Sequence, residues 1–207
     1  MFGIEWLNPE TITALGTVGL FITCAIVFAE TGLLFGFFLP GDSLLFLVGL
    51  AISTGVIDVP VGIACAMISV SAFAGDQTGY WIGRKVGPAV FNRPNSRLFN
   101  SKNVDRAHAF FERYGSKAVI LAHFVPIMRT FIPISAGVAK MSWRKYTTYN
   151  VFAVLVWGTG VTLLGFFLGS IPFVREHVAY VTLAFIVISF IPIGLEVLKV
   201  LRHKKAS

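Results

Sequence analysis

Charged side chains are scarce in this sequence: Asp, Glu, Lys and Arg make up 13 % of its 207 residues. Soluble domains carry about 25 % charge, so too little polar surface remains here to cover a globule in water. This shortage excludes an ordinary soluble enzyme and a disordered tail. Cysteine is also rare. Cys24 and Cys65 lie in apolar stretches without metal-ligand spacing, which excludes a disulfide-stapled module and a Cys/His metal site.

Hydrophobic residues, by contrast, make up 56 % of the chain, and the mean hydropathy is +0.78. We therefore expect a single all-α integral membrane domain over residues 1–207. A helix needs about 20 apolar residues to cross a bilayer. Four stretches are predicted to do so: 11–28, 57–83, 146–171 and 178–199. Residues 1–20 contain no Lys or Arg, so no signal peptide is expected there.

Two further apolar segments contain helix breakers and are predicted to be re-entrant helical hairpins. The first covers residues 29–54. The second covers residues 118–139, where Pro126 and Pro133 are expected to break the helix and Gly137 to turn it. Non-helical backbone at membrane depth survives only when it is buried in protein or lines a wet cavity. Both hairpins are therefore candidate parts of a functional site.

Basic residues determine the topology that we predict. The net charge is +7, and eight of the seventeen Lys and Arg residues fall between Arg84 and Lys117. Basic clusters separated by apolar runs follow the positive-inside rule. Residues 84–117 are therefore predicted to be a cytoplasmic amphipathic segment, and nucleic-acid binding is not expected. The C-terminus is then cytoplasmic, and parity puts the N-terminus inside as well. The outer and inner hairpins, each followed by a span, form an inverted repeat.

Four ionisable residues fall in or near predicted membrane depth: Glu30, Asp42, Asp76 and Arg129. Each charge costs on the order of 2.5–3.5 kcal/mol at the centre of a spanning helix, so these groups must be paired, hydrated or neutralised. Such residues are functional candidates. Glu30, Asp42 and Asp76 are predicted to exchange protons. The alternatives are that Asp42 only caps a helix and that Asp76 pairs with Arg84 or a polar neighbour.

Arg129 is predicted to bind an anionic substrate together with its neighbour Thr130. A guanidinium in a broken hairpin suits a bidentate grip on phosphate or carboxylate. The alternative is that Arg129 is a buried structural partner of Glu30 or Asp42. His123 is a further candidate for the substrate site, with a lipid-facing or core histidine as its alternative.

No catalytic constellation emerges from the sequence. It contains no HExxH, GxSxG or P-loop motif, and its carboxylates are not spaced for metal ligation. We therefore expect a protein that is not an enzyme and uses neither a cofactor nor a metal. Its expected partners are a membrane lipid and protons, with a homo-oligomer as an open possibility.

Several segments of the chain resemble the DedA family, which is related to the VTT-domain lipid scramblases. The first hairpin is similar to the family's E-x-G-(L/F)…P-G-(D/E) motif through Glu30-Thr-Gly-Leu and Pro40-Gly41-Asp42. A second motif, G-D…Y-x-I-G-R, resembles Gly75-Asp76, Tyr80 and Ile82-Gly83-Arg84. A third, R-F-x-P-x-x-R-(T/P)…P…A-G, resembles Phe124, Pro126, Arg129-Thr130, Pro133 and Ala136-Gly137. A later N-x6-W resembles Asn150 and Trp157, so the likeness covers about residues 28–170.

This resemblance implies a bacterial inner-membrane protein that moves undecaprenyl phosphate inward for envelope synthesis. It also implies dependence on the membrane potential or the proton gradient. One position departs from the family pattern, because His123 stands where the family often has arginine. The role of that arginine is therefore not carried over to His123.

Three functions remain open on the sequence. The first is a lipid-phosphate translocase, the second a proton-coupled ion or solute antiporter without a lipid substrate, and the third a non-transporting envelope scaffold. Costly charges cluster at the helix breaks, which favours a transporter over a scaffold. The preference for a lipid over an ion comes from the resemblance alone.

Overall fold

The computed structural model describes residues 9–33, 41–91, 111, 113–177, 180, 183–184 and 187. Within these residues the chain is helical and contains no strand, which confirms the all-α prediction. The first half contains α1 (Pro9–Gly32), α2 (Gly41–Ser53) and α3 (Val61–Phe91). The second half contains η3 (Gly115–Lys117), α5 (Ala118–Ala122), α6 (Pro126–Val138), α7 (Trp143–Val154), the π-helical turn η4 (Leu155–Thr159), α8 (Gly160–Gly169) and α9 (Pro172–Glu176).

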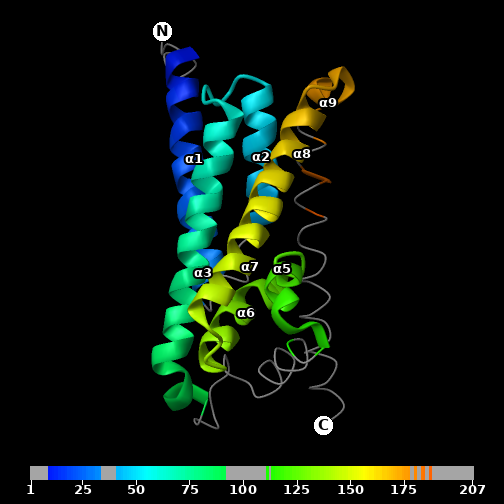
Figure 1. Cartoon of the computed structure of the whole chain (residues 1–207). Helices are drawn as coiled ribbons and strands as arrows, with labels where there is room; N and C mark the ends of the chain where they lie inside the picture. The colour runs from blue at the N-terminus through cyan, green and yellow to red at the C-terminus, as the bar shows by residue number, and fades with distance from the viewer. Residues whose placement is uncertain are drawn as a thin grey trace, which may run out of the picture.

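Two helices are long and apolar enough to cross a membrane, Val61–Lys85 and Trp143–Gly169. The second is continuous through α7, η4 and α8, as Figure 1 shows. These helices correspond to the predicted spans 57–83 and 146–171. Most of the predicted span 178–199 and most of the predicted cytoplasmic segment lie outside the described residues. The full arrangement of four spans and two re-entrant hairpins therefore stays a prediction.

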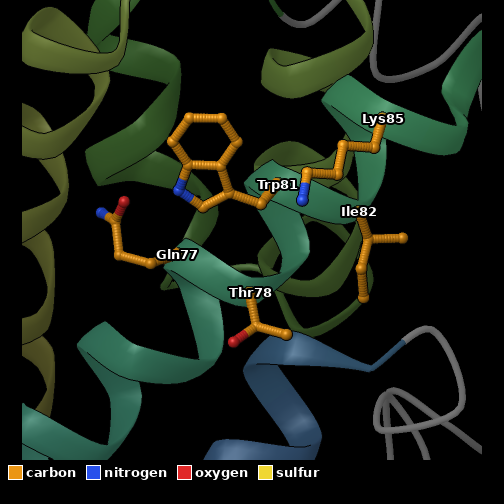
Figure 2. Close-up of a pocket in the computed structure, with 5 residues that line it drawn as sticks. All are labelled: Gln77, Thr78, Trp81, Ile82 and Lys85. Carbon is orange, nitrogen blue, oxygen red and sulfur yellow. The ribbon is translucent and has the colours of Figure 1, made fainter.

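Large apolar side chains on the long helices point outward, which is typical of a surface in contact with lipid. Phe21, Val70, Phe152 and Phe167 are each more than 60 % exposed. A shallow pocket of about 360 Å³ lies on α3 and is lined by Gln77, Thr78, Trp81, Ile82 and Lys85, as Figure 2 shows. Tryptophan and lysine side chains of this kind are enriched where a membrane protein meets the water interface.

Each short helix packs along the long helix of the other half. Helix α2 contacts α8 closely, where Gly49 lies against Thr162 and Gly165 against the carbonyl of Phe46. Helix α6 contacts α3 in the same way, where Gly83 lies against Ile134 and Gly137 against Tyr80. The sequence predicts the second contact, because glycines recur at every fourth residue from Gly75 to Gly87 and allow a helix to approach.

The two short helices begin side by side and run in opposite directions. Arg129 in the first turn of α6 contacts Asp42 in the first turn of α2. From there α2 runs parallel to α8 and α6 runs parallel to α3, toward opposite ends of the molecule (Figure 1). The short helices α2 and α6 thus lie on long helices of opposite direction, and the predicted inverted repeat stays a prediction.

Helix α1 differs from the prediction for residues 11–28. It continues through Gly32, so Glu30 belongs to its last turn rather than to a separate hairpin that begins at residue 29. Gly16 lies against Val56 in the turn after α2, and Gly32 lies against Gly75 near the middle of α3. Helix α1 therefore ends halfway along α3. The inside orientation of the N-terminus stays a prediction.

The second broken segment also differs in detail. Its break falls at His123–Val125, and α6 begins at Pro126 after an extended Val125. Proline fits this first helical position because its missing N–H is not needed there. Pro133 does not break the helix but lies inside α6, where it packs against Gly79. Gly137 likewise lies within α6 and provides the close contact with Tyr80 rather than a turn.

Replacing Gly137 by alanine is expected to destabilise the protein by about 1–3 kcal/mol, because the new Cβ would collide with the backbone carbonyl of Tyr80. Thermal unfolding in detergent measures this loss. Gly160→Ala is the matched control, since a Cβ at this helical position meets nothing within 4 Å. Equal unfolding temperatures for the two variants would contradict the packing of α6 on α3.

Candidate functional site

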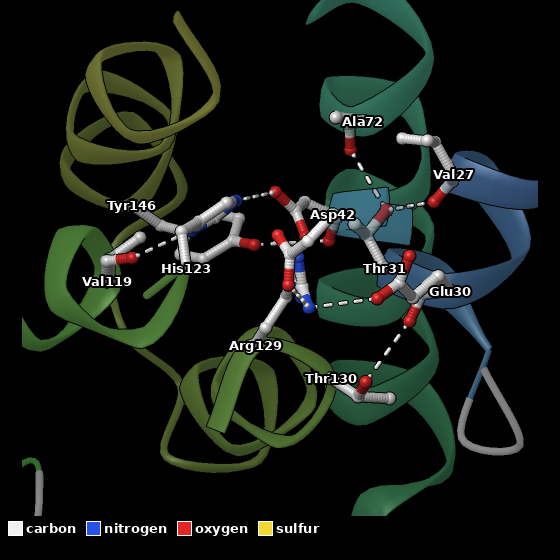
Figure 3. Close-up of polar contacts among 11 residues, drawn as sticks. Val27, Glu30, Thr31, Asp42, Ala72, Val119, His123, Arg129, Thr130 and Tyr146 are labelled. Atoms are coloured by element: carbon white, nitrogen blue, oxygen red, sulfur yellow. Dashed lines mark hydrogen bonds and ion pairs between the residues drawn. The ribbon is translucent and has the colours of Figure 1, made fainter. Parts of the chain in front are cut away.

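Arg129 lies at the centre of a buried cluster of charges, shown in Figure 3. Its guanidinium donates two parallel hydrogen bonds to Asp42, from Nη1 to Oδ1 at 3.0 Å and from Nη2 to Oδ2 at 3.1 Å. Nη2 also forms an ion pair with Oε1 of Glu30 at 2.9 Å. The side chains of Arg129 and Glu30 are each 2 % exposed. The structure thus brings together three residues that the sequence singled out, from the end of α1 and the starts of α2 and α6.

The start of α2 is shaped to receive Glu30. A Cβ at Gly41 would collide with Oε2 of Glu30, so only glycine leaves room for this carboxylate against the backbone. Asp42 follows immediately in the first turn of α2, where an acidic residue is also favoured by the helix dipole. Helix capping is therefore not the sole role of Asp42, because both of its carboxylate oxygens accept hydrogen bonds from Arg129.

Trp157 completes the surroundings of Arg129. Its ring lies 4.6 Å from the guanidinium carbon, and its Nε1 donates a 2.6 Å hydrogen bond to Oδ1 of Asp42. Trp157 belongs to the π-helical turn η4, and such turns are frequent at functional sites. Trp157 is not among the predicted site residues; its place in the N-x6-W motif is the signal in the sequence that points to it.

Asp76 and His123 form a second buried pair. Nε2 of His123 lies 3.0 Å from Oδ2 of Asp76, and the two side chains are 2 % and 0 % exposed. Nδ1 of His123 lies 3.2 Å from the carbonyl of Val119, while the Tyr146 hydroxyl donates to the carbonyl of Asp76. Asp76 therefore pairs with His123, a polar neighbour, and not with Arg84. The lipid-facing alternative for His123 is wrong.

The Arg84 guanidinium donates instead to the Tyr80 hydroxyl at 2.7 Å and to the carbonyl of Met141 at 3.2 Å. These contacts join the far end of α3 to the segment before α7. Arg84 is therefore not the partner of Asp76.

Thr130 contacts the protein backbone rather than open space. Its hydroxyl donates a 3.1 Å hydrogen bond to the carbonyl of Glu30. Thr31, next in the chain, bonds to the carbonyls of Val27 and Ala72, as Figure 3 also shows. In this conformation Thr130 therefore positions the last turn of α1, and its predicted contact with substrate stays a prediction.

Several buried polar atoms in the described part of the chain have no hydrogen-bond partner. They are Glu30 Oε2, Ser43 Oγ, Asp76 Oδ1, Arg129 Nε and both amide atoms of Asn150. Glu30 and Arg129 belong to the first group of charges, and Asp76 belongs to the pair with His123. Ser43 follows Asp42, and Asn150 precedes Trp157 by two helical turns. Buried polar groups are nearly always satisfied by protein or water. The site is therefore built to receive water or a polar ligand.

The cluster carries more acidic than basic groups. Glu30, Asp42 and Asp76 face one permanent cation, Arg129, and one titratable base, His123. Among the residues that the structure describes, no group of three or more His, Cys, Asp and Glu side chains could hold a metal ion. The arrangement can bind protons, and it can offer Arg129 to an anion when a carboxylate releases it.

Trp157→Phe is expected to weaken the Arg129–Asp42 pair, because it keeps an aromatic ring beside the guanidinium but removes the donor to Asp42. Hydrogen bonds to charged groups contribute about 1.5–3 kcal/mol. Thermal unfolding in detergent should detect a loss of this size. Trp81→Phe, on the exposed face of α3, serves as the control and is expected to unfold like the wild type.

Comparisons with known proteins agree with the membrane character of the chain. The model of the VTT domain matches residues 39–167, more than half of the sequence. An uncharacterized membrane protein of Mycobacterium leprae is 44 % identical over 90 % of this chain and 82 % of its own length. Protein DedA of Escherichia coli K12 is 41 % identical over 88 % of this chain and 82 % of its own length. The inner membrane protein YghB of Salmonella typhimurium is 34 % identical over 82 % and 75 %. No solved structure matches the chain.

Proposed function

Because this chain belongs to the DedA family of VTT-domain membrane proteins, we propose that it is a transporter of a polyprenyl-phosphate lipid. The lipid is undecaprenyl phosphate, moved inward across a bacterial plasma membrane. The protein carries the headgroup without changing it chemically, so no enzymatic step is part of this proposal. Its C-terminus is placed in the cytoplasm.

The observation that carries this proposal is the meeting of two oppositely directed short helices at Arg129. Helix N-termini attract phosphate through their free N–H groups and their dipole, and both α2 and α6 begin at this point. A guanidinium can hold a phosphate by two hydrogen bonds, as Arg129 holds Asp42 here. A phosphate headgroup therefore replaces Asp42 as the partner of Arg129, while the polyprenyl tail remains in lipid.

Proton exchange on Glu30 and Asp42 supplies the coupling. When either carboxylate takes up a proton it loses its charge, and Arg129 is then held less strongly. The free guanidinium accepts the phosphate, and loss of the proton returns Arg129 to its carboxylates. One charge that crosses 100 mV gains about 2.3 kcal/mol, which corresponds to a bias of about fifty-fold. This is enough to drive the headgroup in one direction.

The test is a flux assay with labelled undecaprenyl phosphate in proteoliposomes that contain the full chain. We expect movement of the label between leaflets that exceeds protein-free vesicles and depends on an imposed proton gradient. Label movement equal to that of protein-free vesicles, with folded protein present, would contradict the proposal.

A second candidate is a proton-coupled ion antiporter, favoured by the excess of acidic groups around Arg129. Carboxylates and unpartnered oxygens are suitable contacts for a cation as well as for a proton. This function predicts pH-driven cation flux in vesicles that contain no lipid phosphate. Flux of lipid phosphate without cation movement would exclude it.

A further inference from the structure

The pair of Asp76 and His123 has no part in the proposed exchange on Glu30 and Asp42. It joins α3 to the end of α5, and both side chains are almost completely buried. The sequence analysis gave the two residues separate roles, and only the structure places them in contact. The contacts of the two side chains also restrict which of their atoms carry hydrogens.

The contacts of the imidazole ring determine how many protons the pair holds. A backbone carbonyl can only accept a hydrogen bond, so the contact with Val119 places a hydrogen on Nδ1 of His123. The 3.0 Å contact between Nε2 and Asp76 Oδ2 then requires a second hydrogen between these two atoms. It belongs either to an imidazolium that faces a carboxylate or to a carboxylic acid that faces a neutral imidazole.

We propose that Asp76 and His123 form a one-proton binding site, separate from the Glu30–Arg129–Asp42 cluster, that is loaded in this conformation. Loss of the proton leaves one ring hydrogen for two acceptors, the Val119 carbonyl and the Asp76 carboxylate, so one of the two contacts is then repulsive. The existence of this site does not depend on what the protein transports. Its use in coupling rests on the proposed function.

The groups that surround the pair explain how its proton affects the transport site. Arg129 of α6 and the Tyr146 hydroxyl of α7 act on Asp76, and Glu30 and Asp42 lie beyond Arg129. Arg129 is the only permanent cation in this set. Its Nε and the Oδ1 atom of Asp76 are both buried without a hydrogen-bond partner.

Release of the proton changes the competition for Arg129. The proton leaves the Nε2–Oδ2 contact for a water molecule, and Asp76 remains as a buried carboxylate without its imidazolium. Arg129 is then attracted toward Asp76 and is held less firmly by Asp42. Trp157 transmits the change as well, since its ring lies 5.8 Å from the His123 ring and its Nε1 holds Asp42. The loaded pair therefore keeps Arg129 on its carboxylates.

Nitrogen NMR of histidine-labelled full-length protein in nanodiscs tests the site directly. His177 is an internal control, because its Nδ1 also lies 3.0 Å from the carbonyl four residues earlier but its ring is not buried. His123→Gln assigns the His123 signals. We expect both ring nitrogens of His123 to show a bound or shared hydrogen at neutral pH.

Asp76→Asn should abolish the hydrogen at Nε2 of His123 and leave His177 unchanged, because an amide supplies its own N–H to the ring. The proposal is overturned if either ring nitrogen of His123 is a bare lone pair at neutral pH in the wild type. It is equally overturned if Asp76→Asn, shown to be folded by an unfolding temperature close to that of the wild type, leaves His123 unaltered. The wild-type measurement alone decides the matter should Asp76→Asn not fold.

A flux measurement separates this inference from the proposed function. His123→Arg keeps a cation beside Asp76 but cannot release the proton, so the part of the pH dependence of lipid-phosphate flux that this pair contributes should be lost, while the part from Glu30 and Asp42 remains. A proton at Nε2 without any lipid-phosphate flux in the wild type contradicts the proposed function and leaves the one-proton site standing. Flux with a bare Nε2 contradicts the site and leaves the proposed function standing.

Discussion

Replacing Arg129 by alanine is expected to abolish lipid-phosphate flux and to lower the free energy of unfolding by about 3–5 kcal/mol. The truncation leaves Glu30 buried without its cation, beside Asp42, whose side chain is 36 % exposed, and breaking a buried ion pair from one side costs this much. Total stabilities are about 5–15 kcal/mol, so reduced amounts of folded protein are also expected. Proteoliposome flux and thermal unfolding in detergent measure the two effects.

The stability loss and the transport loss can be separated by removing the stranded charges. A triple variant, Arg129→Ala with Glu30→Gln and Asp42→Asn, contains no uncompensated carboxylate in this cluster. It should regain much of the lost stability but still transport nothing, because no guanidinium remains to bind phosphate. Arg113→Ala, at an exposed arginine, is the control for the same chemical change. Transport by the triple variant would show that Arg129 is a structural partner only.

Replacing Glu30 by glutamine is expected to weaken the effect of the proton gradient on lipid flux. Glutamine keeps the shape of the side chain in the space beside Gly41 but cannot exchange a proton at neutral pH. Asp42 remains as an exchangeable carboxylate, so the proposed bias of about fifty-fold per 100 mV should fall but not vanish, as measured by label distribution under an imposed gradient.

Stability distinguishes this variant from the loss of Arg129. Two carboxylates share Arg129 in the wild type, so Arg129 keeps Asp42 as a charged partner after Glu30→Gln. We expect an unfolding temperature close to that of the wild type. Glu10→Gln, a remote acidic position on α1, is the control and should leave the response to the gradient intact. A full response to the gradient in Glu30→Gln would assign the coupling to other groups.

The sequence predicted the helical class and the two long helices because apolar length alone determines them. It also predicted the glycine contact of α3, since a repeat of every fourth residue marks one helix face. It misjudged α1 and Pro133 for a common reason. Both depend on tertiary contacts, namely Gly32 against Gly75 and Pro133 against Gly79, which keep the chain helical where local rules predict a break.

The charged residues of the site can be identified from the sequence more readily than the contacts between them. Charge at membrane depth identifies Glu30, Asp42, Asp76 and Arg129, since each is too costly to be accidental. Which acid meets which base depends on helices far apart in the chain. Trp157 was missed as well, because a tryptophan in an apolar helix carries no signal that it donates to a carboxylate 115 residues away.

The exchange of short helices between the halves has a consequence for assembly. Since α2 packs on α8 and α6 packs on α3, the long helix of each half has one face that is covered by the short helix of the other half. A fragment that ends after α3 would expose Gly79 and Gly83 with nothing seated in their groove. The two halves are therefore expected to fold together rather than as separate units, because each needs a helix of the other to cover its packing face.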